Sequence, residues 1–306
     1  MPTLTEALRT YLQIERRPLT NKQYRLILTH VIEQLGPSRQ VARVTYEDLI
    51  DVQADLRSRL KPSTVANYTS IYKAFFAWCA QRGYCDVSPV ADLVRRRPAN
   101  RSNRAIPPDD LRRLIDYARV TSPRDYAMLM FLADTGCRVG GLITLRSSAL
   151  SLESGIAMLT EKGGKPHRAL FSSATAEALA GWLSRRPQLD HDYVFVARGT
   201  GAPLTRGAVN SLFKTLCRKC ELSRLWTPHA IRHAVGHAYA KAGVPATITQ
   251  RKLGHSDVGT TLNFYYPTED PYLDLVSERL SLAALRSEDE LRAPVSKITD
   301  LERKRA

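Results

Sequence analysis

The segment from Asp86 to Arg104 constrains the fold most, because it interrupts the regular spacing of apolar residues on either side of it. Its prolines are Pro89 and Pro98, and its arginines are Arg95, Arg96, Arg97, Arg101 and Arg104. Prolines and a run of like charges are typical of a linker rather than of a packed element. We therefore expect a domain over residues 1–90, a basic linker over 91–104, a second domain over 105–285 and a charged tail over 286–306.

The first domain is predicted to be a bundle of helices. Apolar residues recur at every third or fourth position, which is the spacing of one buried helix face. The segments with this pattern are 3–15, 20–35, 45–60 and 62–82. The last segment carries Tyr72, Phe75, Phe76 and Trp78, and we interpret these aromatic residues as core, with Lys73 among them.

The second domain is predicted to mix helices with a small sheet. Its first helix is expected to be capped by Asp109 or Asp110, and the next, over 122–135, to end at Gly136. A β-hairpin is expected over 155–171, with its turn at 162–165, and a further short strand at 193–196. Later helices are expected over 174–186, 206–220, 228–242 and 245–253. The fold class is therefore mainly α with a small β-sheet.

The charge of the chain indicates a polyanionic partner. The sequence holds 45 Lys and Arg against 30 Asp and Glu, and the part up to Arg104 holds 17 against 9, so both domains are basic. Such a balance fits a polyanion that both domains touch, although charge alone leaves DNA-binding, RNA-binding and ribosomal roles open. The longest apolar run, over 126–133, is too short to span a membrane, and we see no secretory signal.

The cysteines favour a reducing compartment. They are Cys79, Cys85, Cys137, Cys217 and Cys220, an odd number that suits reduced thiols in a cytoplasm better than a disulfide framework. Cys217 and Cys220 have the spacing of half a zinc site, but no second Cys or His pair completes the set. We expect neither a metal nor a cofactor.

A set of residues in a fixed order supplies the chemistry of phosphodiester transfer. They are Arg138 in ADTGCR, Lys162 in TEKGGK, His229 and Arg232 in TPHAIRH, His255 in KLGHSD and Tyr265 in TTLNFYY. Guanidinium groups can hold phosphate oxygens, an ammonium can protonate a leaving oxygen, and a phenol can attack phosphorus. Each motif alone is common, and the ordered set is what indicates a function.

Some positions in this set keep a competitor. Lys165 lies on the same predicted turn as Lys162, and Tyr266 follows Tyr265 directly. Because one residue step on a helix turns the side chain by about 100°, only one of the two tyrosines should reach the phosphate. His233 and His237 lie near the face of His229 and Arg232, and we interpret them as packing or capping residues.

These motifs resemble those of the tyrosine recombinase (phage-integrase-like) family, from about residue 104 to residue 267. The resemblance implies a helical, SAM-like core-binding domain and an α+β catalytic domain that clamp duplex DNA. It also implies that strands are cleaved and rejoined at specific sites through a covalent 3′-phosphotyrosine, without metal or ATP. The implied roles are phosphate binding for Arg138, Arg232 and His255, general acid for Lys162, assistance to proton transfer for His229, and nucleophile for Tyr265.

The resemblance further implies a homo-oligomer on DNA, from dimer to tetrameric synapse, with the C-terminal tail exchanged between protomers. Outside the catalytic set, the residues expected to bind DNA are Lys73, Arg95, Arg96, Arg97, Arg101, Arg104, Lys165 and Arg168. We expect a cytoplasmic protein of the prokaryotic nucleoid with no membrane partner. The sequence leaves open whether accessory DNA-bending proteins take part, and whether the outcome is integration, excision, resolution or transposition.

The chain departs from the family pattern at two positions. Gly141 stands where the family usually has an acidic residue, three positions after the first arginine. Phe264 stands nine residues after His255, where many members have the nucleophile, while Tyr265 fits those with a spacing of ten. Two alternatives stay open: a catalytically impaired site-specific DNA-binding protein of the same fold, which Gly141 alone supports, and a type IB topoisomerase-like enzyme, which uses the same chemistry.

Overall fold

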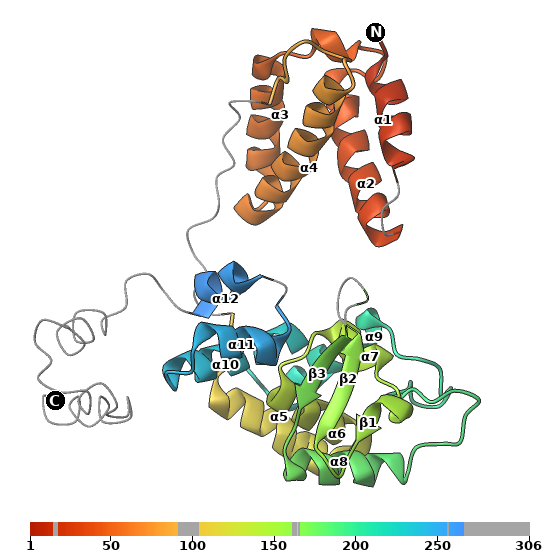
Figure 1. Ribbon diagram of the computed structural model, residues 1–306, viewed down its shortest axis with the longest axis vertical. Helices are drawn as coiled ribbons and strands as arrows, with labels where there is room; N and C mark the ends of the chain where they lie inside the picture. Colours follow the sequence, from red (N-terminus) through yellow and green to blue (C-terminus); the bar gives the residue numbers. More distant parts are fainter. Residues whose placement is uncertain (15–17, 91–103, 161–163, 165, 256, 266–306) are drawn as a thin grey trace, which may run out of the picture. The chain divides into compact units, whose positions relative to one another are not determined.

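The chain divides into two compact units, Met1–Arg101 and Ser102–Ala306. The computed structural model describes residues 1–14, 18–90, 104–160, 164, 166–255 and 257–265 (Figure 1). Most of the predicted linker, with Arg95, Arg96, Arg97 and Arg101, and the predicted C-terminal tail lie outside these residues. What is described is mostly helical with one small sheet, so the predicted fold class is confirmed.

The described part of unit 1 is helical. Its elements are α1 (Leu4–Leu12), α2 (Pro18–Leu35), the 3-10 turn η1 (Val41–Arg43), α3 (Tyr46–Arg59) and α4 (Pro62–Gln81). Two of the helices begin with a reciprocal cap: Thr3 with Glu6 in α1, and Thr45 with Asp48 in α3. These caps satisfy backbone N–H groups that the first turn of a helix leaves without partners.

The aromatic residues of α4 form the centre of the core of unit 1. Tyr72, Phe75 and Phe76 are fully buried, and Trp78 packs partly buried against them. Phe75 meets Tyr11 of α1 edge to face, with ring centroids 5.3 Å apart. Such offset aromatic pairs stabilise a core beyond the area that they bury. The interpretation of this stretch as core, rather than as a platform for bases, is confirmed.

Unit 2 consists of helices packed around α6 and a sheet. Its helices are α5 (Pro108–Thr121), α6 (Pro123–Thr135), α7 (Val139–Thr144), α8 (Ser173–Leu183), α9 (Arg206–Lys219), α10 (Pro228–Lys241), α11 (Ala246–Leu253) and α12 (Val258–Tyr265). After the turn η2 (Ser147–Ala149), the strands β1 (Leu150–Ser151), β2 (Ile156–Thr160) and β3 (Pro166–Leu170) form an antiparallel sheet in chain order.

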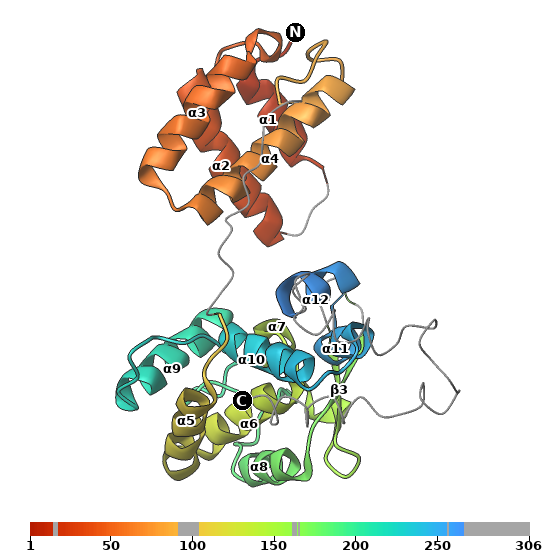
Figure 2. The ribbon, with the colours of Figure 1, turned by 90° about the vertical axis from the view of Figure 1, so that its left-hand side faces the viewer.

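The arrangement of α6, α10, α11 and α12 positions the site described below. The buried helix α6 packs against α5, α8 and α10, and α10 packs against both α11 and α12. Figure 1 and Figure 2 both show α12 next to α11. As predicted, α6 ends at Gly136 and α11 ends at Gly254, each in the left-handed conformation with φ of 59° and 65°.

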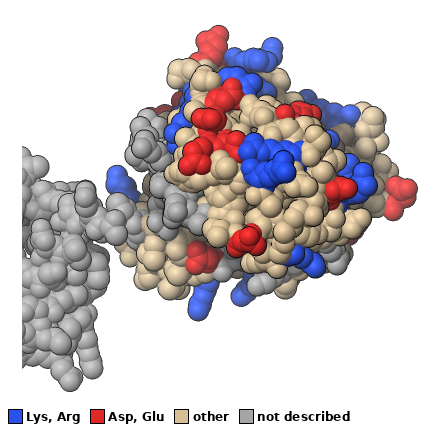
Figure 3. Space-filling view, turned by 90° about the horizontal axis from the view of Figure 1, so that it is seen from above, with Lys and Arg blue, Asp and Glu red and all other residues tan. Residues whose placement is uncertain are grey.

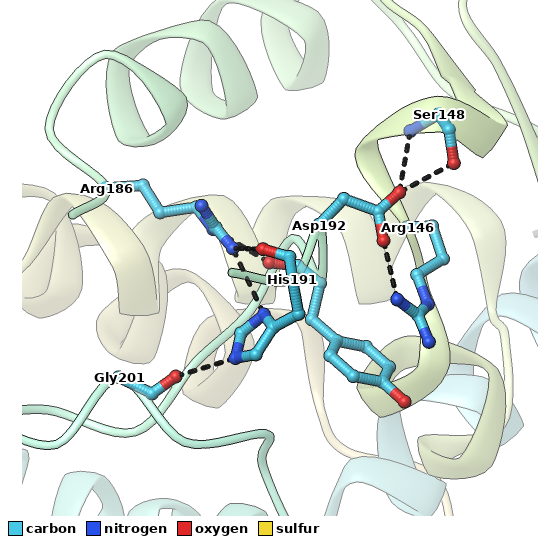
Figure 4. Close-up of polar contacts among 7 residues, drawn as sticks. Arg146, Ser148, Arg186, His191, Asp192 and Gly201 are labelled. Atoms are coloured by element: carbon cyan, nitrogen blue, oxygen red, sulfur yellow. Dashed lines mark hydrogen bonds and ion pairs between the residues drawn. The ribbon is translucent and has the colours of Figure 1, made fainter. Parts of the chain in front are cut away.

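A set of polar contacts holds the loop after α8 against the segment that follows α7 (Figure 4). Asp192 accepts hydrogen bonds from Ser148 Oγ and Arg146 Nη1, both at 2.6 Å, and the Arg146 guanidinium lies 3.8 Å from the centroid of the Tyr193 ring. Arg186 donates to the carbonyl of His191 at 2.7 Å. The bonds from Ser148 and Arg146 lower the pKa of Asp192 to about 2.

Two details of the predicted secondary structure are wrong. Residues 193–196 form no strand: Tyr193 pairs only with Arg146 and Val196 only with Pro203, each as an isolated bridge. Neither Asp109 nor Asp110 caps α5, because Pro107 is the N-cap and Pro108 begins the helix. Asp110 instead accepts a hydrogen bond from Trp226 Nε1 at 2.7 Å.

Among the described residues, no helix combines the length and the apolar character that crossing a membrane would require.

Candidate active site

Arg232 lies at the centre of the candidate site. It is on the first turns of α10, is 1% exposed, and its Nη1 donates to the carbonyl of Gly136 at 2.8 Å. Gly136 suits this position because its φ is positive, and because a Cβ there would lie 2.7 Å from Leu253 Cδ2. The end of α6 therefore fixes one guanidinium of the site.

Arg138 is held in a similar way by the end of another helix. It is the N-cap residue of α7, two positions after Gly136, and its Nη1 donates to the carbonyl of Gly254 at 2.9 Å. Gly254 ends α11 with a positive φ and directly precedes His255. A backbone carbonyl thus helps to orient each of the two guanidinium groups.

A row of histidines lies along one face of α10. His229, His233 and His237 follow one another at intervals of four residues, which places them on the same side of the helix. The rings of His229 and His233 meet edge to face, with centroids 4.5 Å apart. His229 is exposed at the start of this row, and His233 is buried with 4% exposure.

Tyr265 packs onto this row from α12. Its hydroxyl lies 3.2 Å from His233 Nδ1, and its ring meets His237 edge to face at 5.2 Å. On its other side the ring lies nearly parallel to that of His255, with centroids 6.1 Å apart and an interplanar angle of 10°. Gly236 makes room for this ring, since a Cβ there would lie 2.4 Å from Tyr265 Cζ.

The site brings the two guanidinium groups close enough to change the pKa of the other groups. Burial raises the pKa of the Tyr265 phenol, and the charges of Arg232 and Arg138 oppose part of that rise. Burial, followed by the same two arginines, lowers the pKa of His255 to about 3. Burial and these arginines also lower the pKa of His229. The histidines around the phenol are therefore neutral at pH 7 and able to accept a proton.

His255 is oriented by its own helix connection. Its Nδ1 lies 2.7 Å from Thr261 Oγ1, and Thr261 is buried in α12. Its carbonyl accepts a hydrogen bond from Gln250 Nε2 at 3.1 Å. The segment between α11 and α12 thus fixes the imidazole beside the phenol.

The structure brings together Arg138, His229, Arg232, His255 and Tyr265 of the predicted catalytic set. Lys162, its competitor Lys165 and the second tyrosine, Tyr266, lie outside the described residues. Phe264 lies 5.6 Å from His233 and 5.9 Å from the Arg104 guanidinium, measured to its ring centroid. Of the two positions favoured by family spacing, residue 265 is therefore the one with a phenol at the two arginines.

Gly141 is buried at the position where an acidic residue was expected. A Cβ there would lie 3.4 Å from Leu159 Cδ1, so β2 packs its apolar side chain against this position. The contacts of Arg138 and Arg232 with Gly254 and Gly136 supply support from the backbone instead.

The predicted DNA-binding residues that are described belong to different units. Lys73 lies in α4 of unit 1, and Arg104 and Arg168 lie in unit 2, both exposed. On the face shown in Figure 3, basic side chains alternate with acidic ones instead of forming one large patch. The net charge of +15 is therefore not concentrated on that face.

The sequence missed the role of His233 and Gly236. The sequence does indicate that both lie on the same face of α10 as His229, because the three are spaced by four and three residues. Their contacts with Tyr265 come from a different helix, α12, and spacing within α10 could not reveal them. Within the described part of the chain, no three His, Cys, Asp or Glu side chains gather as a metal ion would need.

The part of the chain that holds this site matches a protein-family model. Residues 104–270, more than half of the chain, match the model of the phage integrase family. The chain belongs to the phage integrase family. As such it is a tyrosine-type site-specific DNA recombinase, and DNA is its partner.

Relatives of this integrase-family chain extend over both units. It is 26% identical over 263 residues to tyrosine recombinase XerD of Listeria innocua serovar 6a, covering 82% of this chain and 88% of that protein. It is 28% identical over 259 residues to tyrosine recombinase XerC of Xanthomonas campestris pv. campestris, covering 82% of this chain and 80% of that protein. The similarity is thus not limited to the catalytic motifs.

Solved structures of recombinases share the fold. The Tn1549 transposon integrase in complex with transposon right end DNA superposes with a TM-score of 0.77 at 18% identity, covering 92% of this chain and 100% of that one. A lambda integrase dimer bound to a COC′ core site superposes with a TM-score of 0.70 at 17% identity, covering 85% and 97%. At these identities the likeness concerns the fold.

Proposed function

We propose that this recombinase cleaves and rejoins DNA strands through a covalent 3′-phosphotyrosine on Tyr265. The observation that carries the proposal is the convergence of one phenol, two guanidinium groups and neutral histidines. The charges of Arg232 and Arg138 act directly on the pKa of Tyr265 and on that of His255. Two cations fixed at one point suit a phosphodiester, whose charge grows on its oxygens in the transition state.

In the proposed step, the phenol oxygen attacks the scissile phosphorus while its proton passes to a neighbouring imidazole. A new ester bond forms between phosphorus and Tyr265, and the bond from phosphorus to the 5′ oxygen breaks. Lys162 donates the proton that the leaving 5′ oxygen takes up, His229 assists proton transfer, and Arg138, Arg232 and His255 hold the phosphate oxygens. The ester conserves the bond energy, so the 5′ hydroxyl can attack it and rejoin the strand without ATP.

Tyr265 must move for this step to occur. Its side chain is 4% exposed and packs between His255 and the α10 face, so the phenol is not presented to the surface where DNA would approach. A small displacement of α12 would admit the phosphate. We propose that binding of the DNA site supplies this displacement.

The proposed active form is a homo-oligomer on DNA, a dimer that pairs into a tetrameric synapse, with the basic linker, Lys73, Arg104 and Arg168 on the DNA backbone. We propose that residues 1–90 form the core-binding domain, that residues 105–285 form the catalytic domain, and that the tail over 286–306 is exchanged between protomers. The lambda integrase dimer on its core site supports the proposed homo-oligomer on DNA by analogy of fold.

The test is a suicide substrate, a nicked recognition site from which cleavage releases a short strand and traps the enzyme. Wild-type protein should give a covalent adduct on a denaturing gel, and Tyr265→Phe should give none while retaining site binding. Tyr266→Phe is the matched control and should retain the adduct. The opposite result for the two variants would move the nucleophile to Tyr266.

Two further arms separate the alternatives. Relaxation of any plasmid without a recognition site would favour a type IB topoisomerase-like enzyme. Site binding by the wild type without any adduct would favour a non-catalytic DNA-binding protein. Addition of EDTA should leave adduct formation unchanged, because side chains supply every charge in the proposed step.

A further inference from the structure

A small cleft of about 190 Å³ lies beside the catalytic cluster, at the start of α10. The polar and aromatic residues that line it are Arg104, Arg224, Trp226, Thr227, His229 and His233. Arg138, Arg232 and His255 are not among its lining residues, and only His229 and His233 are shared with the cluster around Tyr265. The cleft is therefore next to the scissile-phosphate site and distinct from it.

The chemistry of the cleft suits an anion. Its described lining carries two guanidinium groups and no carboxylate. Thr227 is the N-cap of α10 but its side chain makes no capping hydrogen bond, and Pro228 occupies the first helical turn. The first-turn N–H groups of this 14-residue helix therefore add their partial positive charge to that of the arginines.

His233 gives an independent indication of a missing partner. It is 4% exposed and lines the cleft, and its buried Nε2 has no hydrogen-bond partner among the described residues. Its Nδ1 is 3.2 Å from the Tyr265 hydroxyl. A buried polar atom without a partner is unfavourable, so a ligand that supplied one would be favoured.

We propose that this cleft binds a DNA backbone phosphate that flanks the scissile one, and that His233 couples this binding to the orientation of the Tyr265 hydroxyl. The inference rests on the proposed function, and it assigns a second contact on the same DNA strand. Arg104 and Arg224 supply the charge. His233 contacts the flanking phosphate through Nε2 and the nucleophile through Nδ1.

The coupling follows from the two nitrogens of a neutral imidazole, of which one donates and the other accepts. If Nε2 carries the proton and donates it to a phosphate oxygen, Nδ1 must accept the hydrogen bond of the Tyr265 O–H. An empty cleft leaves both tautomers available, and in one of them Nδ1 is a donor and the phenol is its acceptor. Phosphate binding thus selects the arrangement in which the phenol proton points to a base.

The charged and titratable groups around His233 are consistent with a neutral ring before DNA binds. From α10 it faces His229, His237 and Arg232, from the segment before α5 it faces Arg104, and from α12 it faces Tyr265. Burial, His229 and Arg104 lower the pKa of His233 to about 4. An anion in the cleft would oppose the effect of these cations, so the ring could then take the phenol proton.

The test is the suicide substrate with one backbone phosphate at a time replaced by a neutral methylphosphonate, leaving the scissile phosphate intact. Wild-type protein should lose at least about tenfold in the rate of adduct formation at one flanking position, as expected for a lost charge-assisted contact. The double variant Arg104→Gln, Arg224→Gln should be slow on unmodified DNA and should lose no more than about twofold upon that replacement. A flat profile in the wild type, or equal sensitivity of the double variant, would overturn the proposal.

A matched pair of His233 variants separates coupling from packing. The amide of His233→Asn lies close to the position of Nδ1, and that of His233→Gln lies close to that of Nε2. His233→Asn should lose the sensitivity to the flanking methylphosphonate, whereas His233→Gln should keep it, and both should be slower than wild type. Sensitivity equal to wild type in both variants would mean that His233 only packs. Thermal unfolding of each variant confirms that the comparison uses folded protein.

The outcomes of these experiments distinguish a failure of the proposed function from a failure of the proposed phosphate-binding cleft. Absence of an adduct on unmodified DNA in the wild type would contradict the proposed function itself, while an adduct with a flat profile contradicts only the cleft. Inhibition of the wild type by inorganic phosphate, relieved in the arginine double variant while the methylphosphonate profile is flat, would reassign the cleft to a free anion and overturn its assignment to DNA.

Discussion

Two pairs of arginines in unit 2 have different hydrogen-bond acceptors. Around the N-terminus of α6, Arg124 and Arg198 both pair with the buried carboxylate of Asp125, at 2.7 and 2.5 Å. At the candidate active site, Arg138 and Arg232 donate to the neutral carbonyls of Gly254 and Gly136. Pairing with a carboxylate cancels the charge and serves the fold, whereas a hydrogen bond to a carbonyl orients a guanidinium and does not itself cancel its charge.

The largest effect expected from this difference concerns catalysis. Arg138→Ala should reduce the rate of adduct formation on the suicide substrate by about 10²–10³, the usual loss for one donor to the charge of a transition state. Site binding should fall much less, because it is spread over many basic contacts. The matched control is Arg198→Ala, whose rate per folded molecule should equal that of the wild type. Equal losses of cleavage and binding in Arg138→Ala would make Arg138 a simple DNA anchor.

A second substitution tests whether the ion pairs of Asp125 stabilise the fold. Asp125→Ala leaves Arg124, with a side chain 9% exposed, without its carboxylate, and should reduce the free energy of unfolding by about 3 kcal/mol. Arg198→Ala should cost less than about 1 kcal/mol, because the Arg198 side chain is 63% exposed. Urea unfolding measures both values. A loss of cleavage by folded Asp125→Ala protein would show that this ion pair also supports the site.

The smallest effect concerns pH. The pKa of His233 is lowered to about 4 in the folded protein against 6.5 as its ordinary value, so unfolding takes up a proton between these values. Stability should therefore fall as pH decreases from 6.5 towards 4, with a contribution of about 1–2 kcal/mol between pH 7 and pH 5. Asp192, with a pKa of about 2, stays ionised across this range. Its contacts with Ser148 and Arg146 should therefore not contribute to the pH dependence of stability.

Chemical unfolding at pH 7 and pH 5 measures this loss. His233→Asn should reduce the difference between the two pH values by its own share of about 1–2 kcal/mol, while His255, whose pKa is also lowered, keeps its share, and Asp192→Asn should leave the difference unchanged. An equal slope in wild type and His233→Asn would show that His233 is not responsible for the acid sensitivity.

The fold was predictable where helices are long and strongly periodic, as in α2, α4 and α6. The error at residues 193–196 has a physical reason: their apolar residues are buried by packing and single bridges, and alternation alone cannot tell this from a strand. The start of α5 was misplaced because Pro107 and Pro108 begin the helix before the aspartates that could have capped it.

The site was predictable as a set of side chains but not as a set of contacts. The order of the motifs indicated Arg138, His229, Arg232, His255 and Tyr265, and these converge. Each of the two arginines donates to a backbone carbonyl, which carries no signature in the sequence, and the carbonyl that Arg138 meets lies 116 residues away. His233 was placed on the correct face of α10, but its contact with Tyr265 depends on where α12 packs.

The hydrogen bonds from Arg232 to Gly136 and from Arg138 to Gly254 have a mechanical consequence. Gly136 lies two residues before Arg138, and Gly254 lies one residue before His255, so the two bonds link the HAIRH, TGCR and LGH motifs in series. We propose that the three motifs move as one unit, so that a displacement of one is transmitted to the others, and that the short helix α12 with the nucleophile moves relative to them in each reaction cycle.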